Sequence, residues 1–298
     1  MNCKFPLSRK RNTNTIYSKF KFMKYFLSLA FLFISLSVSS QNLQEKADAI
    51  LKEAKELLVM EQASWHATDN FLATYPDKKN LIRGYFSYVN KDNDLVSVFY
   101  GEGKDLILAR YLFKGIPSPE RLFVDTENLQ ITDLEADLLE MRKTAFEDMV
   151  DNKKGFYSFY EKVNPNLIPI IFEGKKKVYI ISGSNEPKML IGNDYEITFN
   201  KRNKIKDRKK LHKSILTFDY TENENVESSF HSHVVSDFID VTDVCTLLLY
   251  KDYTGINKHI VVSKKYVSIL NLEEETLLIL TKKAWDKIMD HQEEKAKK

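Results

Sequence analysis

Two histidines one residue apart, followed by three aspartates, form the segment of this chain whose residue types could do chemistry. His231 and His233 stand in the segment FHSHVVSDFIDVTDV, and Asp243 follows ten residues after the second histidine. Residues two apart in a β-strand point to the same face, so a strand ending here would place both imidazoles side by side. Thr242 is a natural N-cap, which would place Asp243 in the first turn of a helix.

Two imidazoles from a strand and one carboxylate from a helix start predict a three-ligand Zn²⁺ site with a fourth position open to water. Such an ion lowers the pKa of its bound water and polarises a carbonyl group. The alternative stays open: both histidines could be ordinary surface or hydrogen-bonding residues, with Asp243 only favouring the helix N-terminus. His66 and His212 are expected to be structural or exposed, and Cys245, inside an apolar run, is expected to be a small buried hydrophobe.

The segment HSH and the later DVTD resemble the JAMM/MPN metalloproteases, in which His-Ser/Thr-His is followed by Ser-x-x-Asp at a helix start. The resemblance is close over about 14 residues and extends in strand and helix order over residues 178–288. It implies that His231, His233 and Asp243 are zinc ligands and that the chain is a peptidase or isopeptidase. Three features depart from the pattern: Val234 replaces a proline, the loop is one residue shorter, and Asp240 occupies the serine position unless Thr242 or Ser236 substitutes.

The same resemblance implies an upstream glutamate as general base. Glu173, Glu186 and Glu196 all precede the histidines, and we prefer Glu196 because the strand predicted for NDYEITF would hold it rigidly. The stretch from IGNDYEITF to KKYVSIL also resembles a family of exported proteins of Bacteroidetes-type bacteria, which implies no activity.

The elements that must position these residues predict an α+β fold. Apolar residues spaced by three and four indicate a helix over about 43–60, and GYFSYVNKDNDLVSVFY is typical of a β-hairpin, with a further strand at 105–113. Thr132 and Glu135 form a capping box that begins a helix over 133–150.

The rest of the chain is expected to be a mostly antiparallel mixed sheet, with a short helix after the His-x-His strand and a C-terminal helix. The basic run Lys201–Lys210 is expected to be a solvated turn or helix. We expect three parts: a leader over 1–40, an N-terminal α+β region over 41–160, and a β-rich region over 161–298 that carries the site.

The first forty residues are typical of an export signal. From Met23, which we expect to be the true start, Lys24 precedes an apolar stretch to about Val38 and then small residues, with cleavage expected after Ser40. About 14 apolar residues are fewer than the roughly 20 that span a bilayer, so no stable membrane anchor is expected after cleavage. The predicted location is the periplasm or the exterior.

Charge excludes one class of partner. The formal charge of the whole chain is +3, but residues 1–40 hold seven basic residues and no acidic ones, so residues 41–298 carry −4. No electrostatic basis for nucleic-acid binding is left. The sequence therefore favours an exported, non-catalytic envelope protein that binds a protein, peptide or glycan, and the alternative is a JAMM-like, zinc-dependent hydrolase.

Overall fold

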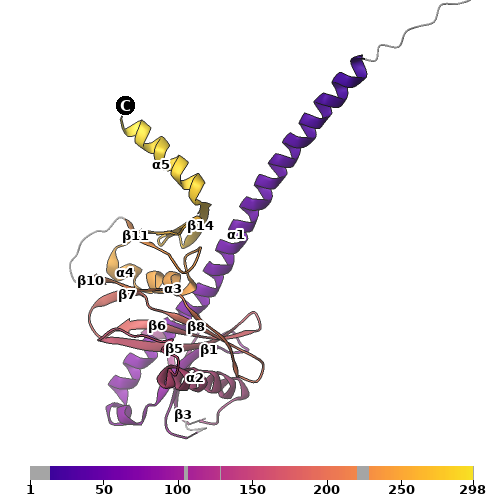
Figure 1. Cartoon of the computed structure of the whole chain (residues 1–298). Helices are drawn as coiled ribbons and strands as arrows, with labels where there is room; N and C mark the ends of the chain where they lie inside the picture. Colours follow the sequence, from indigo (N-terminus) through magenta and orange to yellow (C-terminus); the bar gives the residue numbers. More distant parts are fainter. Residues whose placement is uncertain (1–13, 104–106, 128, 220–227, 298) are drawn as a thin grey trace, which may run out of the picture. The chain divides into compact units, whose positions relative to one another are not determined.

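The computed structural model of the chain describes residues 14–103, 107–127, 129–219 and 228–297, with side chains from residue 41 onward (Figure 1). By contacts between Cα atoms, the described residues from 47 onward form one compact unit. The side chains of the predicted leader lie outside the described residues. In the part of the chain that is described, no helix is both long and apolar enough to cross a membrane.

Helix α1 (Asn14–Thr74) continues well beyond the predicted end at residue 60. The reason lies in its second half, where Ala63, Ala67 and Phe71 recur every fourth residue and are fully buried. Phe71 stacks on Phe99 with 4.7 Å between ring centroids. This apolar stripe packs against the rest of the compact unit, and tertiary burial therefore extends the helix.

The predicted hairpin is confirmed as the start of an antiparallel sheet in the order β1-β2-β3-β4. Its strands are β1 (Gly84–Val89), β2 (Leu95–Tyr100), β3 (Ile107–Phe113) and β4 (Leu122–Asp125), with the short 3₁₀ helices η1 (Pro76–Leu81) and η2 (Pro119–Arg121) beside them. Asn90 closes the hairpin turn, because its side chain accepts hydrogen bonds from the backbone N–H groups of Asp92 and Asp94.

Helix α2 (Asp133–Asp151) begins at the predicted capping box, in which the Thr132 hydroxyl accepts from the Glu135 backbone and the Glu135 carboxylate accepts from the Thr132 backbone. The helix is shared between two cores. Leu138 and Leu139 pack with the first sheet, and Met141 and Ala145 pack with the second.

The second sheet has the order β5-β6-β8-β9 and is antiparallel throughout. Its strands are β5 (Val163–Phe172), β6 (Lys175–Ser184), β8 (Tyr195–Phe199) and β9 (Ile205–Lys210), and β7 (Lys188–Gly192) pairs separately with β10 (Ile215–Asp219). The basic run is thus a turn followed by strand β9, rather than a turn or helix alone. Its charged side chains tolerate strand structure because most of β9 is solvent-exposed at this edge of the sheet.

The third sheet carries the histidine segment and has the order β11-β12-β13-β14. It comprises β11 (Ser228–Ser232), β12 (Lys258–Val262), β13 (Tyr266–Asn271) and β14 (Thr276–Thr281), followed by helix α5 (Lys282–Ala296). Strands β11 and β12 are parallel, which requires a crossover between them. Helices α3 (Val241–Leu249) and α4 (Lys251–Thr254) form that crossover.

The predicted α+β fold class is confirmed.

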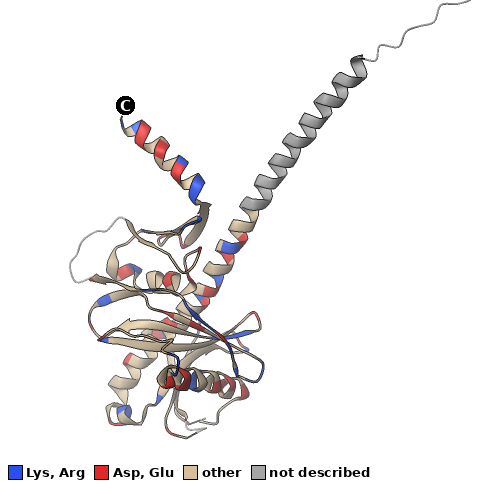
Figure 2. Ribbon diagram, in the orientation of Figure 1, with Lys and Arg blue, Asp and Glu red and all other residues tan. Residues whose placement is uncertain are grey.

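Basic and acidic residues are interspersed over the helices and strands of the described residues, with both signs along α5 (Figure 2).

Candidate metal centre

Strand β11 brings His231 and His233 together, as the spacing predicts. His231 lies on β11 and His233 directly after its last residue, and both side chains are buried while Phe230 and Ser232 face outward. The backbone N–H of His233 donates to the carbonyl of Val262 at 2.9 Å, which continues the pairing with β12 past the end of the strand. Both imidazoles therefore leave the same face of a fixed backbone.

Helix α3 supplies Asp243, although not through the predicted cap. The N-cap is Asp240 rather than Thr242, so Asp243 is the third helical residue and completes a capping box with Asp240. Its Oδ2 atom accepts from the Asp240 backbone N–H at 3.2 Å. Thr242 was a chemically reasonable cap, but Asp240 is equally suited and the chain turns into the helix two residues earlier.

His212 is the fourth member of the cluster, and it is buried rather than exposed. It lies between β9 and β10, and its Nε2 atom lies 3.0 Å from Asp243 Oδ1. Gly192 permits this approach, since a Cβ atom there would lie 2.5 Å from the Ser214 carbonyl and 3.4 Å from the His212 ring, and its φ is +100°. A lone histidine 21 residues before His233, between lysines, carries no local signal that could have identified it.

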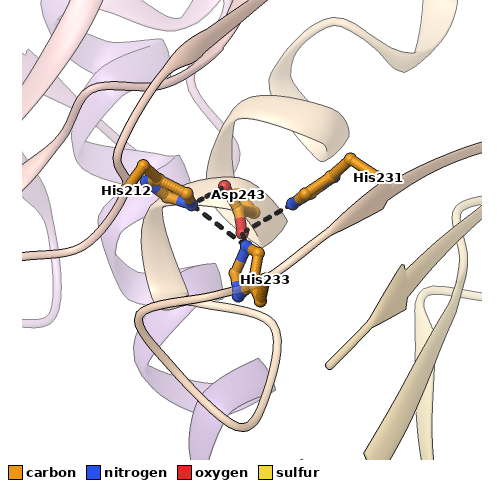
Figure 3. Close-up of side chains that lie close together, drawn as sticks. All are labelled: His212, His231, His233 and Asp243. Carbon is orange, nitrogen blue, oxygen red and sulfur yellow. Dashed lines mark hydrogen bonds and ion pairs between the residues drawn. The ribbon is translucent and has the colours of Figure 1, made fainter. Parts of the chain in front are cut away.

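The four side chains converge on one point (Figure 3). One donor atom from each of His212, His231, His233 and Asp243 lies within 4.8 Å of the others, and all four residues are buried. The His212 and His233 Nε2 atoms are 3.2 Å apart, and His233 Nε2 lies 3.1 Å from Asp243 Oδ2. His231 Nε2 lies 3.7 Å from the same oxygen. Tetrahedral zinc with bonds of ~2.0–2.1 Å places neighbouring donors about 3.3 Å apart, so these four residues could hold a metal ion.

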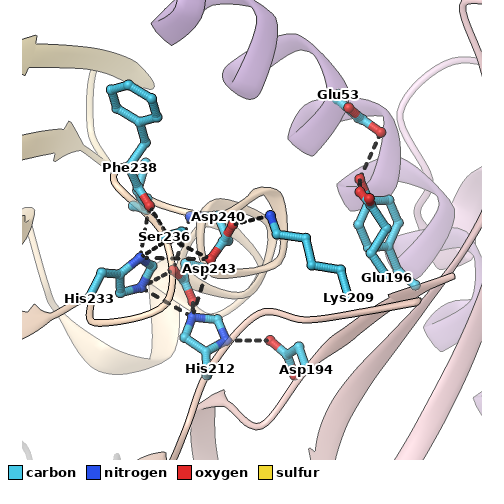
Figure 4. A network of polar contacts seen from close by, with 12 residues as sticks. Glu53, Asp194, Glu196, Lys209, His212, His233, Ser236, Phe238, Asp240 and Asp243 are labelled. Carbon is cyan, nitrogen blue, oxygen red and sulfur yellow. Dashed lines mark hydrogen bonds and ion pairs between the residues drawn. The ribbon is translucent and has the colours of Figure 1, made fainter. Parts of the chain in front are cut away.

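The contacts of His233 fix which of its nitrogens faces the cluster. Its Nδ1 atom lies 2.8 Å from the carbonyl oxygen of Phe238 and 2.7 Å from the hydroxyl of Ser236 (Figure 4). A carbonyl can only accept, so Nδ1 carries the proton of the neutral ring. The lone pair of Nε2 then points at a carboxylate and at a second imidazole nitrogen, an arrangement that a cation between them would stabilise.

A buried chain of hydrogen bonds orients His231. His231 Nδ1 lies 2.7 Å from His259 Nε2, and His259 Nδ1 lies 2.7 Å from the hydroxyl of Ser229. His259 is the second residue of β12 and is fully buried. Metal binding at His231 Nε2 selects the arrangement in which His231 donates to His259 and His259 donates to Ser229.

Three buried polar atoms of the cluster have no hydrogen-bond partner among the described residues: His212 Nδ1, His231 Nε2 and Asp243 Oδ1. Buried polar groups are nearly always satisfied, because an unmet donor or acceptor costs about 1–3 kcal/mol. Two of the three atoms point into the cluster, where a metal ion would satisfy them.

The Asp243 carboxylate is the negative charge of the cluster, and it shifts the pKa values of the imidazoles around it. Burial opposes ionisation of Asp243, but His212 and His233 outweigh it and hold the pKa of that carboxyl well below its usual range. Burial also opposes the charged form of His212, yet Asp243, with Asp194 and Asp240 beyond it, raises the pKa of His212 to about 9. Burial lowers the pKa of His231 to about 3, so this ring is neutral and ready to act as a ligand.

The structure does not bring Glu196 into the cluster. Its carboxylate accepts from the Tyr179 hydroxyl at 3.0 Å and lies 3.2 Å from the Lys177 ammonium, on the side of strand β8 near Glu53 (Figure 4). A general base must lie within hydrogen-bond reach of the water it deprotonates, and Glu196 is instead held in an ion pair.

The other two upstream glutamates are also engaged elsewhere. Glu173 pairs with Lys52, and Glu186 pairs with Lys162 and Lys188, all on the exposed surface. The acids that do border the cluster are Asp194, whose Oδ2 lies 3.9 Å from His212 Nδ1, and Asp240, whose Oδ2 lies 3.7 Å from His233 Nδ1.

A cavity of about 490 Å³ borders the three histidines. Its other walls come from β7, β10, β11, β12 and the segments that follow β9 and β11, and they are mainly aliphatic. An ion in the cluster would therefore be reachable from one side, through this cavity.

Cys245 lies on α3 away from this cavity and is buried as predicted. Its burial raises the pKa of its thiol.

Comparisons with protein-family models, curated proteins and solved structures find no match for the chain. The case for a function therefore rests on the chemistry of the site itself.

Proposed function

We propose that this chain is a zinc-binding protein whose ion is held by His212, His231, His233 and Asp243. The observation that supports this most strongly is the convergence of three imidazole Nε2 atoms on one buried carboxylate, at 3.0, 3.1 and 3.7 Å from its oxygens. A metal ion at this point would accept the imidazole lone pairs and offset the negative charge of the buried Asp243 carboxylate.

The donor set suits zinc better than the hard cations. Calcium and magnesium take six or more oxygen ligands, whereas three imidazoles and one carboxylate form a four-coordinate set typical of zinc. The outer contacts also match a metal-ligating histidine, because His233 donates to the Phe238 carbonyl and His231 is backed by His259. No thiolate takes part, so the site would tolerate the oxidising compartment to which the predicted leader would direct the chain.

Metal analysis tests the proposal. Wild-type protein purified with zinc and freed of loosely bound ions should contain about one zinc per chain, and Asp243→Ala and His233→Ala should contain almost none. His291→Ala is the matched control, since His291 is exposed on α5 and should leave the zinc content unchanged. Wild-type protein that holds no stoichiometric zinc would rule the proposal out.

His212→Ala separates the two possible ligand sets. If the ion needs all four residues, this variant loses zinc as His233→Ala does. If the three residues predicted from the sequence suffice, His212→Ala retains zinc at reduced affinity and gains a position open to water.

Hydrolysis by a JAMM-like mechanism is a second candidate function, which the cavity at the three histidines favours. The bound ion would polarise the carbonyl group of a substrate and lower the pKa of a water molecule bound to it. Against it, none of the three upstream glutamates considered lies at the cluster, so the base that the family pattern requires has no candidate among them. Zinc-loaded protein that cleaves peptide libraries, with activity lost in His233→Ala, would support this candidate, and a loaded protein without activity would favour the non-catalytic alternative.

A further inference from the structure

The cavity at the metal cluster concentrates apolar side chains that are exposed to solvent. Phe230, Val234, Val235 and Leu216 are 78%, 69%, 43% and 38% exposed, and all four line the cavity. Scattered exposed hydrophobics need no explanation, but a group of them around one hollow indicates a binding site. The exposure of Phe230 follows from strand alternation, because its side chain leaves the face of β11 opposite to the buried His231.

The cavity lining contains no acidic residue. Apart from three histidines, its one ionisable side chain is Lys213, which has no ion-pair partner among the described residues. Asp243 lies beneath the histidines and does not line the cavity. A divalent ion bound at the floor would add two positive charges beside the Asp243 carboxylate, with Asp194 and Asp240 bordering the cluster behind the histidines. The cavity would therefore present a metal ion at its floor, a lysine and aliphatic walls.

We propose that the cavity binds a small anionic ligand that carries a carboxylate next to an apolar chain, with the carboxylate directed to the metal ion and Lys213 and the chain lying against Leu216, Phe230 and Val234. This inference rests on the proposed zinc site. The cavity borders the three histidines, so a carboxylate bound in it could approach the ion from that side, and zinc sites sometimes expand from four to five ligands. A volume of about 490 Å³ lies within the range of small-molecule sites.

A homologous ligand series tests the proposal by calorimetry on the zinc-loaded full chain. Acetate, butanoate, hexanoate and octanoate share the head group, and burial of each methylene should tighten binding about fourfold. Octanol lacks the charge and should bind more weakly than octanoate. N-acetyl-leucine distinguishes the source of the carboxylate: tighter binding than hexanoate indicates a peptide C-terminus, and weaker binding indicates a simple acyl chain.

Variants of the wall and the lysine separate the two contributions. Leu216→Asp should weaken octanoate binding about tenfold or more, because a charge would be placed against the chain. Leu278→Asp is the matched control, since Leu278 is similarly exposed on β14 and does not line the cavity. Lys213→Ala should weaken octanoate binding about two- to fivefold and leave octanol binding unchanged.

Zinc content measured on the same samples separates failure of this inference from failure of the zinc proposal. Protein that holds zinc but binds octanoate no more tightly than acetate overturns the apolar-carboxylate ligand and leaves the zinc site intact. Protein without zinc overturns both.

Discussion

Two buried charged clusters in this molecule differ in how completely the chain satisfies them. At the start of α2, the fully buried Glu135 carboxylate receives hydrogen bonds from Arg110, from Tyr88 and from the backbone of Thr132. At the start of α3, Asp243 lies among three imidazoles, with His212 Nε2 3.0 Å from Oδ1 and His233 Nε2 3.1 Å from Oδ2, and the facing His231 Nε2 has no hydrogen-bond partner among the described residues. Both carboxylates occupy the third helical position and both belong to a capping box.

The difference indicates different roles. A buried ion pair with every lone pair satisfied needs nothing from outside the chain, so Glu135 serves the fold. A buried cluster with unmet lone pairs on a cavity is costly to keep, and such costs are typical of binding sites rather than of structural cores. Breaking the first cluster should therefore unfold the protein, and breaking the second should empty a site.

The largest effect is expected for Glu135→Ala. Removal of the carboxylate leaves Arg110 and Tyr88 without their partner, which should lower the free energy of unfolding by about 3–5 kcal/mol. Urea denaturation followed by circular dichroism measures it, with Glu147→Ala, an exposed residue of the same helix, as the control. The fraction that stays folded should still bind zinc. A loss below about 1 kcal/mol would show that the pair does not stabilise the fold.

Acid should remove the same contribution. Burial favours the protonated form of Glu135, but the hydrogen bonds and charge of Arg110 outweigh it, so its folded pKa lies below the ordinary 4.5. A carboxylate with a lowered folded pKa contributes stability that is fully present above its unfolded pKa and is lost as pH falls through the folded value. Wild type should therefore lose more stability than Glu135→Gln between neutral pH and pH values below 4.5. If the free energy of unfolding, measured by urea denaturation, fell equally for both proteins over that pH range, the prediction would be wrong.

The second cluster should affect stability through zinc. An ion that binds only the folded state stabilises it by about 2.7 kcal/mol when free zinc is 100 times its Kd. Asp243→Asn should lose this stabilisation, because it removes the charge that holds the ion. Thermal unfolding with zinc and with a chelator measures the difference for each protein. A wild-type Tm that does not respond to zinc would place Asp243 in the same structural class as Glu135.

A smaller effect is expected for His259→Asn. His259 would not contact the ion but positions His231, because its Nε2 atom lies 2.7 Å from His231 Nδ1, and loss of such a partner lowers metal affinity about 10- to 100-fold. Competition with a chromogenic chelator measures the affinity. His259→Gln, whose amide can still accept from His231, should recover part of it. Unchanged zinc affinity in His259→Asn would show that Ser229 and His259 serve packing alone.

The local part of the metal centre could be predicted from the sequence. The spacing of His231 and His233 placed both on one face of a strand, and the apolar run after Asp243 placed it at a helix start. The capping box of α2 was equally visible, because Thr132 and Glu135 interact across three residues. The choice of cap for α3 was wrong, since Asp240 and Thr242 both suit that position and no local feature distinguishes them.

The non-local part could not be predicted. His212 joins the cluster because β9, the turn at Gly192 and the pairing of β7 with β10 bring it there. The pairing of β6 with β8 holds Glu196 near Lys177, although the strand of Glu196 was predicted. His259 lies beside His231 because of the parallel register of β11 and β12, which no local pattern indicates.

Periodicity and capping in the sequence by themselves determined the α+β class, most of the helices and strands, and the proximity of three of the four residues that could hold a metal ion. They act over a few residues, where backbone geometry decides which side chains share a face. Only the tertiary structure decided that His212 completes the cluster, that His259 supports it, and that an apolar cavity opens onto it. These features depend on strand pairing and on a crossover between parallel strands, which join residues far apart in the chain and leave no local pattern.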